Sequence, residues 1–290
     1  WEKIKDGPLH LPQAEVERIH RYFAPPSFEA LPEINAEFET AKLENRDFAR
    51  WARANLVKHR VSGYSIVNVS LKPEGGTPGD VSADQMDLLA DLADRFSLNE
   101  IRVTHHQNMV LPHVRKRDLY ALWQQLKAAK LATPNLGFIS DIIACPGLDY
   151  CTLANARSIP VAQRLSRHFS DPRKQDEIGE LRLNISGCIN ACGHHHVGHI
   201  GILGVDKHGQ EFYQVTLGGS SKDDAALGKI VGASFSEDEI VPAVDTIIQT
   251  YLANRTGRGE RFVDYYRRVG MDPFKEALYG PATARRPAAE

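Results

Sequence analysis

The sequence predicts an α+β fold in which a ferredoxin-like unit is followed by an α/β domain. Between Val61 and residue 144, apolar patterns follow the order strand, helix, strand, strand, helix, strand, which is the split βαβ order of ferredoxin-like units. Strand-like and helix-like segments then continue to about residue 280. The four cysteines of the chain form two tight pairs in this second part, and the first pair begins directly after a predicted strand.

These patterns predict four segments. Residues 1–55 mix charge with prolines, which indicates short helices joined by extended stretches, so we expect a connecting arm. Residues 56–135 are the expected ferredoxin-like unit, and residues 136–280 are the expected second domain. Residues 281–290 have nothing to bury, and we expect a disordered tail.

Within the ferredoxin-like unit, strands and helices are predicted by their different periods. Val67, Val69 and Leu71 alternate as in a half-buried strand, and Ser82 and Gln85 have the spacing of a helix capping box. Two helices should each bury an apolar stripe, the first formed by Leu89, Leu92, Ala93 and Phe96 and the second by Leu119, Leu122, Trp123 and Leu126. Between them, "IRVTHHQNMVL" has two short apolar runs around a polar centre, and "LGFISDIIA", residues 136–144, is predicted as the last strand.

The second domain is predicted to mix helices with strands. Helices are expected over residues 152–169 and 237–253, with a further aromatic-rich segment over 261–270. Strands are expected at "ELRLNIS", "HIGILGV" and "EFYQVTLGG", residues 180–186, 199–205 and 211–219.

Composition excludes some classes of function. The net charge is −2, from 35 basic and 37 acidic residues, which argues against general nucleic-acid binding. No apolar run approaches the roughly 18 residues that a membrane span needs, so we expect no membrane partner. The residues that follow Trp1 lack the basic and apolar regions typical of a secretory signal, so we expect none among them.

The cysteine spacing, Cys145-x5-Cys151 and Cys188-x3-Cys192, predicts a metal centre. Thiolates select zinc, copper(I) or iron–sulfur clusters, and a five-residue gap is longer than in most zinc knuckles. Glycines close to the cysteines would let backbone N–H groups approach the sulfurs, which favours a [4Fe-4S] cluster. Structural zinc, local disulfides and unligated thiols stay open as alternatives. Zinc held by His194, His195, His196 and His199 is less favoured, because adjacent side chains point away from a common centre.

Several motifs together resemble one family. They are "IRVTHHQNMVL", which is similar to an R-x-T-x-x-Q-N motif, the two cysteine pairs with Asn190 inside the second, and "VTLGG" downstream. In this order they resemble the siroheme-dependent sulfite and nitrite reductases, in the half that carries the iron–sulfur cluster. The resemblance runs from about Val61 to about Leu278.

The resemblance implies two cofactors, a [4Fe-4S] cluster and siroheme. The cluster would be held by Cys145, Cys151, Cys188 and Cys192, with the Cys192 thiolate bridging it to the siroheme iron. Siroheme carries eight carboxylates, which need cationic and backbone donors. The candidate siroheme contacts are Arg102, Thr104, His106, Gln107, Asn108, Asn190 and His194. For Arg102, a solvated charge at a strand end is an equal alternative.

The resemblance also implies a function. We expect the cluster-bearing half of an assimilatory sulfite reductase, with nitrite reduction to ammonia as an alternative, and a non-catalytic electron-transfer module or structural zinc protein as others. The expected partners are the N-terminal half of the enzyme, a ferredoxin or flavoprotein donor, and a small anionic substrate. Without that half, we expect the chain to be inactive and to lack siroheme, or even the cluster. Reduced thiols indicate the cytoplasm, and a plastid fits equally.

Overall fold

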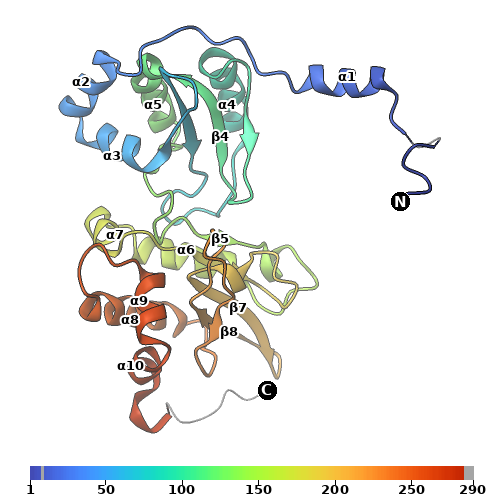
Figure 1. Ribbon diagram of the computed structural model, residues 1–290. Coiled ribbons are helices and arrows are strands. Elements are labelled where there is room, and N and C mark those ends of the chain that lie inside the picture. The colour runs from blue at the N-terminus through green and yellow to red at the C-terminus, as the bar shows by residue number, and fades with distance from the viewer. Residues whose placement is uncertain (8–9, 284–290) are drawn as a thin grey trace.

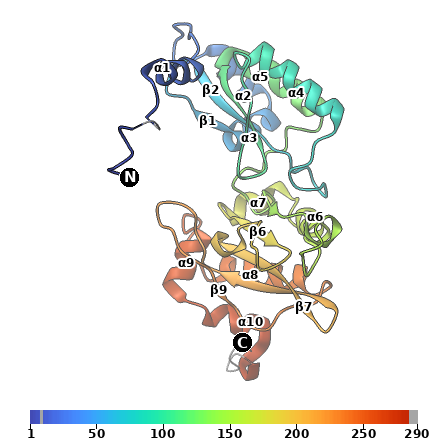
Figure 2. The ribbon, with the colours of Figure 1, turned by 90° about the vertical axis from the view of Figure 1, so that its right-hand side faces the viewer.

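The computed structural model describes residues 1–7 and 10–283, which form two units, each around its own sheet (Figure 1). Helix α1 stands away from the body of the protein in Figure 1, and Figure 2, turned by 90°, shows the first unit above the second. The first unit contains α1 Gln13–Tyr22, α2 Ala36–Glu44, α3 Arg46–Asn55, β1 Leu56–Lys58, β2 Tyr64–Val69, α4 Ala83–Phe96, β3 Arg102–Val103, β4 Met109–Arg115, the 3-10 turn Lys116–Asp118 and α5 Leu119–Ala128.

The second unit follows a connecting loop. It contains β5 Ile143–Ala144, the 3-10 turn Gly147–Asp149, α6 Ile159–His168, α7 Pro172–Ile178, β6 Leu183–Ser186, the 3-10 turn His195–Val197, β7 Ile200–Lys207, β8 Gln210–Leu217, β9 Lys229–Ile230, α8 Ile240–Asn254, α9 Phe262–Val269 and α10 Asp272–Thr283.

The first unit has the predicted ferredoxin-like character. Its sheet has the order β1-β2-β4-β3, with every neighbouring pair antiparallel. Both predicted apolar stripes, on α4 and α5, are buried against this sheet. The capping box at the start of α4 is also present, because Ser82 accepts from the Gln85 N–H and the Gln85 side chain accepts from the Ser82 N–H.

The prediction of a single strand over residues 136–144 is wrong. Only Ile143 and Ala144 are extended, and they pair with β6 in the second sheet. Residues 135–141 form turns instead, because Gly137 has a φ of 77° and its N–H donates to the Asp141 carboxylate. The edge of the first sheet is filled by β1, which precedes β2 along the chain.

The expected connecting arm contributes to the first core in its second half. Helix α3 buries Phe48, Trp51 and Ala52, and the Phe48 ring lies 5.4 Å from the Trp123 ring of α5. Asn35 and Asn45 cap α2 and α3 by accepting backbone N–H groups. Only the part that includes α1, which has no buried residues, matches the expectation of an unpacked arm.

The second unit is built on a mixed sheet with the order β5-β6-β7-β8-β9. The pairs β5–β6 and β6–β7 are parallel, and the other two pairs are antiparallel. The three predicted strands and the predicted helix over 237–253 are present as β6, β7, β8 and α8. The predicted helix over 152–169 is shorter, since α6 begins only at Ile159, with Pro160 in its first turn.

The beginning of the expected C-terminal tail is helical. Residues 281–283 of the expected tail belong to α10, and residues 284–290 lie outside the described residues. Within the described part of the chain, no helix is long and apolar enough to cross a membrane.

Candidate metal centre

Two of the cysteines stand at the carboxyl ends of neighbouring parallel strands. Cys145 follows β5 and Cys188 lies two residues beyond β6, and Ala144 pairs with Ile185 across the two strands. The Cys145 N–H donates to the Ile185 carbonyl oxygen at 3.1 Å. Because parallel strands end at the same edge of a sheet, the two cysteine loops begin side by side.

The two cysteine loops are joined by backbone hydrogen bonds. The N–H groups of Asn155 and Ala156 both donate to the Gly187 carbonyl oxygen, at 2.8 and 3.0 Å. The Gly187 N–H donates to Cys145 Sγ at 3.0 Å. This is the approach of backbone N–H to sulfur that the glycines near the cysteines predicted, and such a bond stabilises a thiolate over a thiol.

The close approach of the loops depends on glycine. A Cβ atom at Gly187 would lie 2.7 Å from the Ala156 carbonyl oxygen and 2.9 Å from the Gly147 Cα. Gly147 itself has a φ of 63°, in the left-handed region that glycine enters without strain. Gly147 and Gly187 therefore allow the two cysteine loops to pack closely against each other.

The turn that carries the second cysteine pair is fixed by residues that sequence reasoning missed. Ser186 Oγ accepts the Gly193 N–H at 3.1 Å, and Asn184 Nδ2 donates to the carbonyl oxygens of Gly193 and His194. Ala191 has a φ of 56°, and its N–H closes the turn onto the Cys188 carbonyl oxygen. Ser186 and Asn184 belong to the predicted strand, so no motif marked them.

The four thiols differ in exposure and are all free. Cys145 and Cys188 are buried, Cys151 is half-buried and Cys192 is exposed. No disulfide joins any two of these four cysteines in the described structure. Four free thiols on glycine-supported loops, one of them accepting a backbone N–H, fit the donor set of an iron–sulfur cluster.

Neither the cysteines nor the neighbouring histidines are gathered closely enough for one metal ion in the described structure. Across residues 1–7 and 10–283, no group of three or more His, Cys, Asp or Glu side chains could hold one metal ion. His199 is buried, and its Nδ1 accepts the Arg182 N–H at 3.2 Å. Burial lowers the pKa of His199 to about 4, which keeps the ring neutral and able to accept that bond. His195 is also buried and has its pKa lowered to about 4 by burial.

Three of the candidate siroheme contacts interact with other residues of the chain. Arg102 is exposed and donates to Glu100 at 2.5 Å. Thr104 Oγ1 accepts the Asn108 N–H and closes the turn between β3 and β4. His106 Nε2 contacts the Arg182 guanidinium, and the pKa of His106 is lowered to about 4, mainly by burial.

Two more candidates, Gln107 and Asn108, hold the units together. Both atoms of the Gln107 amide bond to the backbone of Ala144. Asn108 is buried, its Oδ1 accepts the Leu71 N–H at 3.1 Å, and its Nδ2 donates to Asp141. The remaining two candidates, Asn190 and His194, are exposed beside Cys192.

A buried ion pair at the same junction had no signal in the sequence. Lys72 Nζ donates to Asp141 Oδ1 and to the His106 carbonyl oxygen, both at 2.6 Å, and only 3% of the Lys72 side chain is exposed. Burial lowers the pKa of Lys72, and the Asp141 carboxylate opposes that shift. The junction between the units is therefore held by buried polar contacts.

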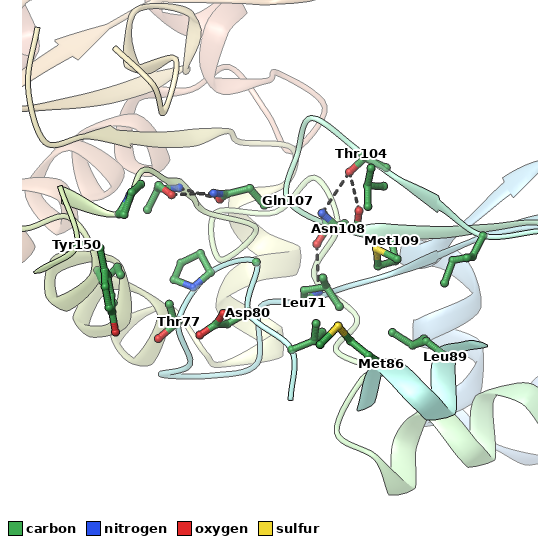
Figure 3. Close-up of a pocket in the computed structure, with 18 of the residues that line it drawn as sticks. Leu71, Thr77, Asp80, Met86, Leu89, Thr104, Gln107, Asn108, Met109 and Tyr150 are labelled. Atoms are coloured by element: carbon green, nitrogen blue, oxygen red, sulfur yellow. Dashed lines mark hydrogen bonds between the residues drawn. The ribbon is translucent and has the colours of Figure 1, made fainter. Parts of the chain in front are cut away.

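A pocket of about 840 Å³ opens between the units, beside the first cysteine loop (Figure 3). Met86 and Leu89 of α4 line one wall, and Tyr150 of the cysteine loop lies across from them. Asp80 is the only charged residue among the described residues that line it. This lining does not supply the cations that eight carboxylates require.

Large apolar side chains stand exposed on the cysteine loops. Tyr150 is 81% exposed and Ile189 is 83% exposed, and Leu148 and Leu153 are also exposed. Exposed apolar side chains near one another are typical of interaction surfaces.

Comparison with known sequences gives two family matches. Residues 138–284 match the nitrite and sulphite reductase 4Fe-4S domain, and residues 62–129 match the nitrite/sulfite reductase ferredoxin-like half domain. The chain is 32% identical over 228 residues to the chloroplastic ferredoxin–nitrite reductase of Arabidopsis thaliana, covering 74% of this chain and 37% of that protein. It is 29% identical over 233 residues to the sulfite reductase [ferredoxin] of Mycobacterium tuberculosis, covering 76% and 42%.

Solved structures show the same relationship. The NirA protein of Mycobacterium tuberculosis matches with a TM-score of 0.60 and 28% identity, over 76% of this chain and 42% of that one. A dissimilatory sulfite reductase I chain matches with a TM-score of 0.61 over all of this chain and 92% of that one, but at 11% identity this likeness shows the fold alone. The chain spans about two fifths of the length of the curated relatives it matches.

Proposed function

Because this chain belongs to the nitrite and sulfite reductase family, we propose that it is the cluster-bearing half of an assimilatory sulfite reductase. The proposed reaction is the six-electron reduction of sulfite to sulfide, and reduction of nitrite to ammonia is the alternative. The family's cofactors are a [4Fe-4S] cluster and siroheme, as the cysteine pairs and the resemblance predicted. When bound, they supply a path for single electrons and an iron at which the anion is reduced.

The observation that most supports this role is the pair of joined cysteine loops. Cys145, Cys151, Cys188 and Cys192 would hold the cluster, and the Gly187 N–H would hold the Cys145 sulfur in place. Cys192 is the exposed one of the four. It is also the cysteine that the resemblance implies as the ligand shared with siroheme, and we propose that it would contact both cofactors.

The rest of the site has to come from another part of the protein. The described pocket lacks cations, and Arg102, Gln107 and Asn108 are engaged with other residues of this chain. The exposed Tyr150 and Ile189 give a second part of the enzyme an apolar surface to cover. We propose that an N-terminal half supplies the basic residues that bind sulfite and the siroheme carboxylates, and that the isolated chain is inactive without it.

The electron donor and the cell compartment follow from the same proposal. Relatives named as ferredoxin-dependent enzymes favour a ferredoxin as donor, with a flavoprotein as the alternative. Four free thiols fit a reducing compartment, and we propose the cytoplasm, with a plastid as the alternative.

Steady-state kinetics of the anaerobic holoenzyme test the substrate. With a reduced donor and either sulfite or nitrite, we expect kcat/KM to be at least about tenfold higher for sulfite. A preference for nitrite would replace sulfite reduction with the alternative. No turnover of either anion by the chain joined to its N-terminal half and containing both cofactors would refute the assignment as a reductase.

A further inference from the structure

The side chain of Gln107 crosses from the ferredoxin-like unit to the second unit. Its Nε2 donates to the Ala144 carbonyl oxygen at 2.8 Å, and its Oε1 accepts the Ala144 N–H at 3.0 Å. Figure 3 shows Gln107 reaching toward the loop that carries Tyr150, with its hydrogen bonds dashed. Ala144 is the residue before Cys145, so both bonds end next to a cysteine of the metal centre.

The position of Ala144 explains why a side chain is needed there. Strand β5 is two residues long and lies at the edge of its sheet. The Cys145 N–H donates to Ile185 of β6. In a strand, the backbone N–H and C=O groups of successive residues point to opposite sides. The N–H and C=O of Ala144 therefore point away from β6, toward the open edge of the sheet. The Gln107 amide has the same donor and acceptor as a peptide group, and it takes the place of a neighbouring strand.

The Gln107 side chain is itself held firmly. Gln107 has a φ of 57°, and its N–H donates to the Thr104 carbonyl oxygen at 3.1 Å within the turn between β3 and β4. The loop that follows β2 passes directly over its stem, where a Cβ at Gly79 would lie 2.9 Å from the Gln107 Cβ. Because Gln107 is fixed within the first unit and bonded to Ala144 of the second, the position of the first unit affects the position of Ala144.

We propose that Gln107 is a positioning residue for Cys145, and that through it the ferredoxin-like unit sets the geometry of the cluster. The Gln107 amide holds Ala144, the β5–β6 hydrogen bond holds Cys145 from the other side, and the Gly187 N–H holds its sulfur. This proposal rests on the proposed function, since it takes Cys145 to be a cluster ligand.

The test compares Gln107→Met in the anaerobic holoenzyme with a matched control. Methionine keeps the length of the side chain and removes both hydrogen bonds, and Gln124→Met makes the same change on the exposed face of α5. Two lost hydrogen bonds correspond to roughly tenfold to thirtyfold in local opening. We expect hydrogen exchange at Ala144, and loss of iron to a ferrous chelator, to be faster by about that factor in Gln107→Met alone.

A spectroscopic signature separates positioning from general stability. The electron paramagnetic resonance spectrum of the reduced cluster should shift in Gln107→Met and stay unchanged in Gln124→Met, because only the former alters a cluster ligand. If Gln107→Met does not fold, Gln107→Glu serves instead. It keeps an acceptor for the Ala144 N–H but sets a carboxylate oxygen against the Ala144 carbonyl oxygen, so changes in the same direction are expected.

The outcomes distinguish this proposal from the one on which it rests. A wild-type protein with acid-labile sulfide, in which Gln107→Met matches Gln124→Met in iron loss and spectrum, would overturn the positioning role alone. A wild-type protein without acid-labile sulfide would overturn the cluster assignment, and the positioning role with it.

Discussion

Replacing Asp141 with asparagine should strongly destabilise the protein, because it leaves the buried Lys72 ammonium without its counter-charge. Asp141 Oδ1 accepts from Lys72 at 2.6 Å and from Asn108 Nδ2 at 3.1 Å, and its Oδ2 accepts the Gly137 N–H at 3.0 Å. Only 3% of the Lys72 side chain is exposed. Breaking one partner of such a pair costs about 3 kcal/mol or more of unfolding free energy.

Urea unfolding of Asp141→Asn measures this loss, with Asp47→Asn as the control. Asp47 pairs with Lys127 at 2.9 Å on the surface, where 74% of its side chain is exposed, so its loss should cost less than about 1 kcal/mol. The cost of Asp141→Asn should shrink as the pH rises, because Lys72 can then lose its proton. Equal costs for the two variants, or a cost independent of pH, would refute the view of this junction as a coupled buried pair.

Three further predictions follow from the site and its supports. Gly187→Ala should lower the content of bound acid-labile sulfide, because its Cβ would lie 2.7 Å from the Ala156 carbonyl oxygen. Gly257→Ala is the control and should not lower it, because a Cβ there has nothing within 4 Å. Equal sulfide contents in the two variants would contradict the role of the close approach. His199 has a folded pKa of about 4, below the unfolded value near 6.5, so it contributes stability above about pH 6.5 that is lost as the pH falls toward 4. His199→Gln should therefore flatten the dependence of unfolding free energy on pH in this window, and an unchanged slope would count against a neutral ring. Ser82→Ala should cost about 1 kcal/mol in urea unfolding through loss of the α4 cap, and no loss would contradict it.

The parts of the fold that were predictable depend on local patterns. The stripes of α4 and α5 and the capping box at Ser82 repeat at helical spacing, so the sequence alone placed them correctly. Residues 136–144 look equally apolar, but the Asp141 carboxylate binds Lys72 and the Gly137 N–H and bends the chain into turns. The edge strand β1 is only three residues long, too short to show an alternating pattern.

The candidate site was predictable to the level of its cysteines and no further. Their spacing predicted the centre, and the glycines near them predicted a backbone approach to the sulfurs, which the Gly187 N–H bond to Cys145 shows. The roles of Gln107 and Asn108 were not visible in the sequence, because an amide can serve a cofactor or a backbone equally well and only the fold decides. Asn184 and Ser186 were hidden within a strand for the same reason.

The central claim is that the four cysteines of this chain hold an iron–sulfur cluster, with Cys192 joined to siroheme. The most direct measurement is the iron and acid-labile sulfide content of the anaerobically purified holoenzyme, together with its visible spectrum, for wild type and Cys192→Ser. We predict about four sulfides per chain in the wild type, with siroheme bands that Cys192→Ser alters. Zinc without sulfide, or a Cys192→Ser spectrum identical to wild type, would contradict the account.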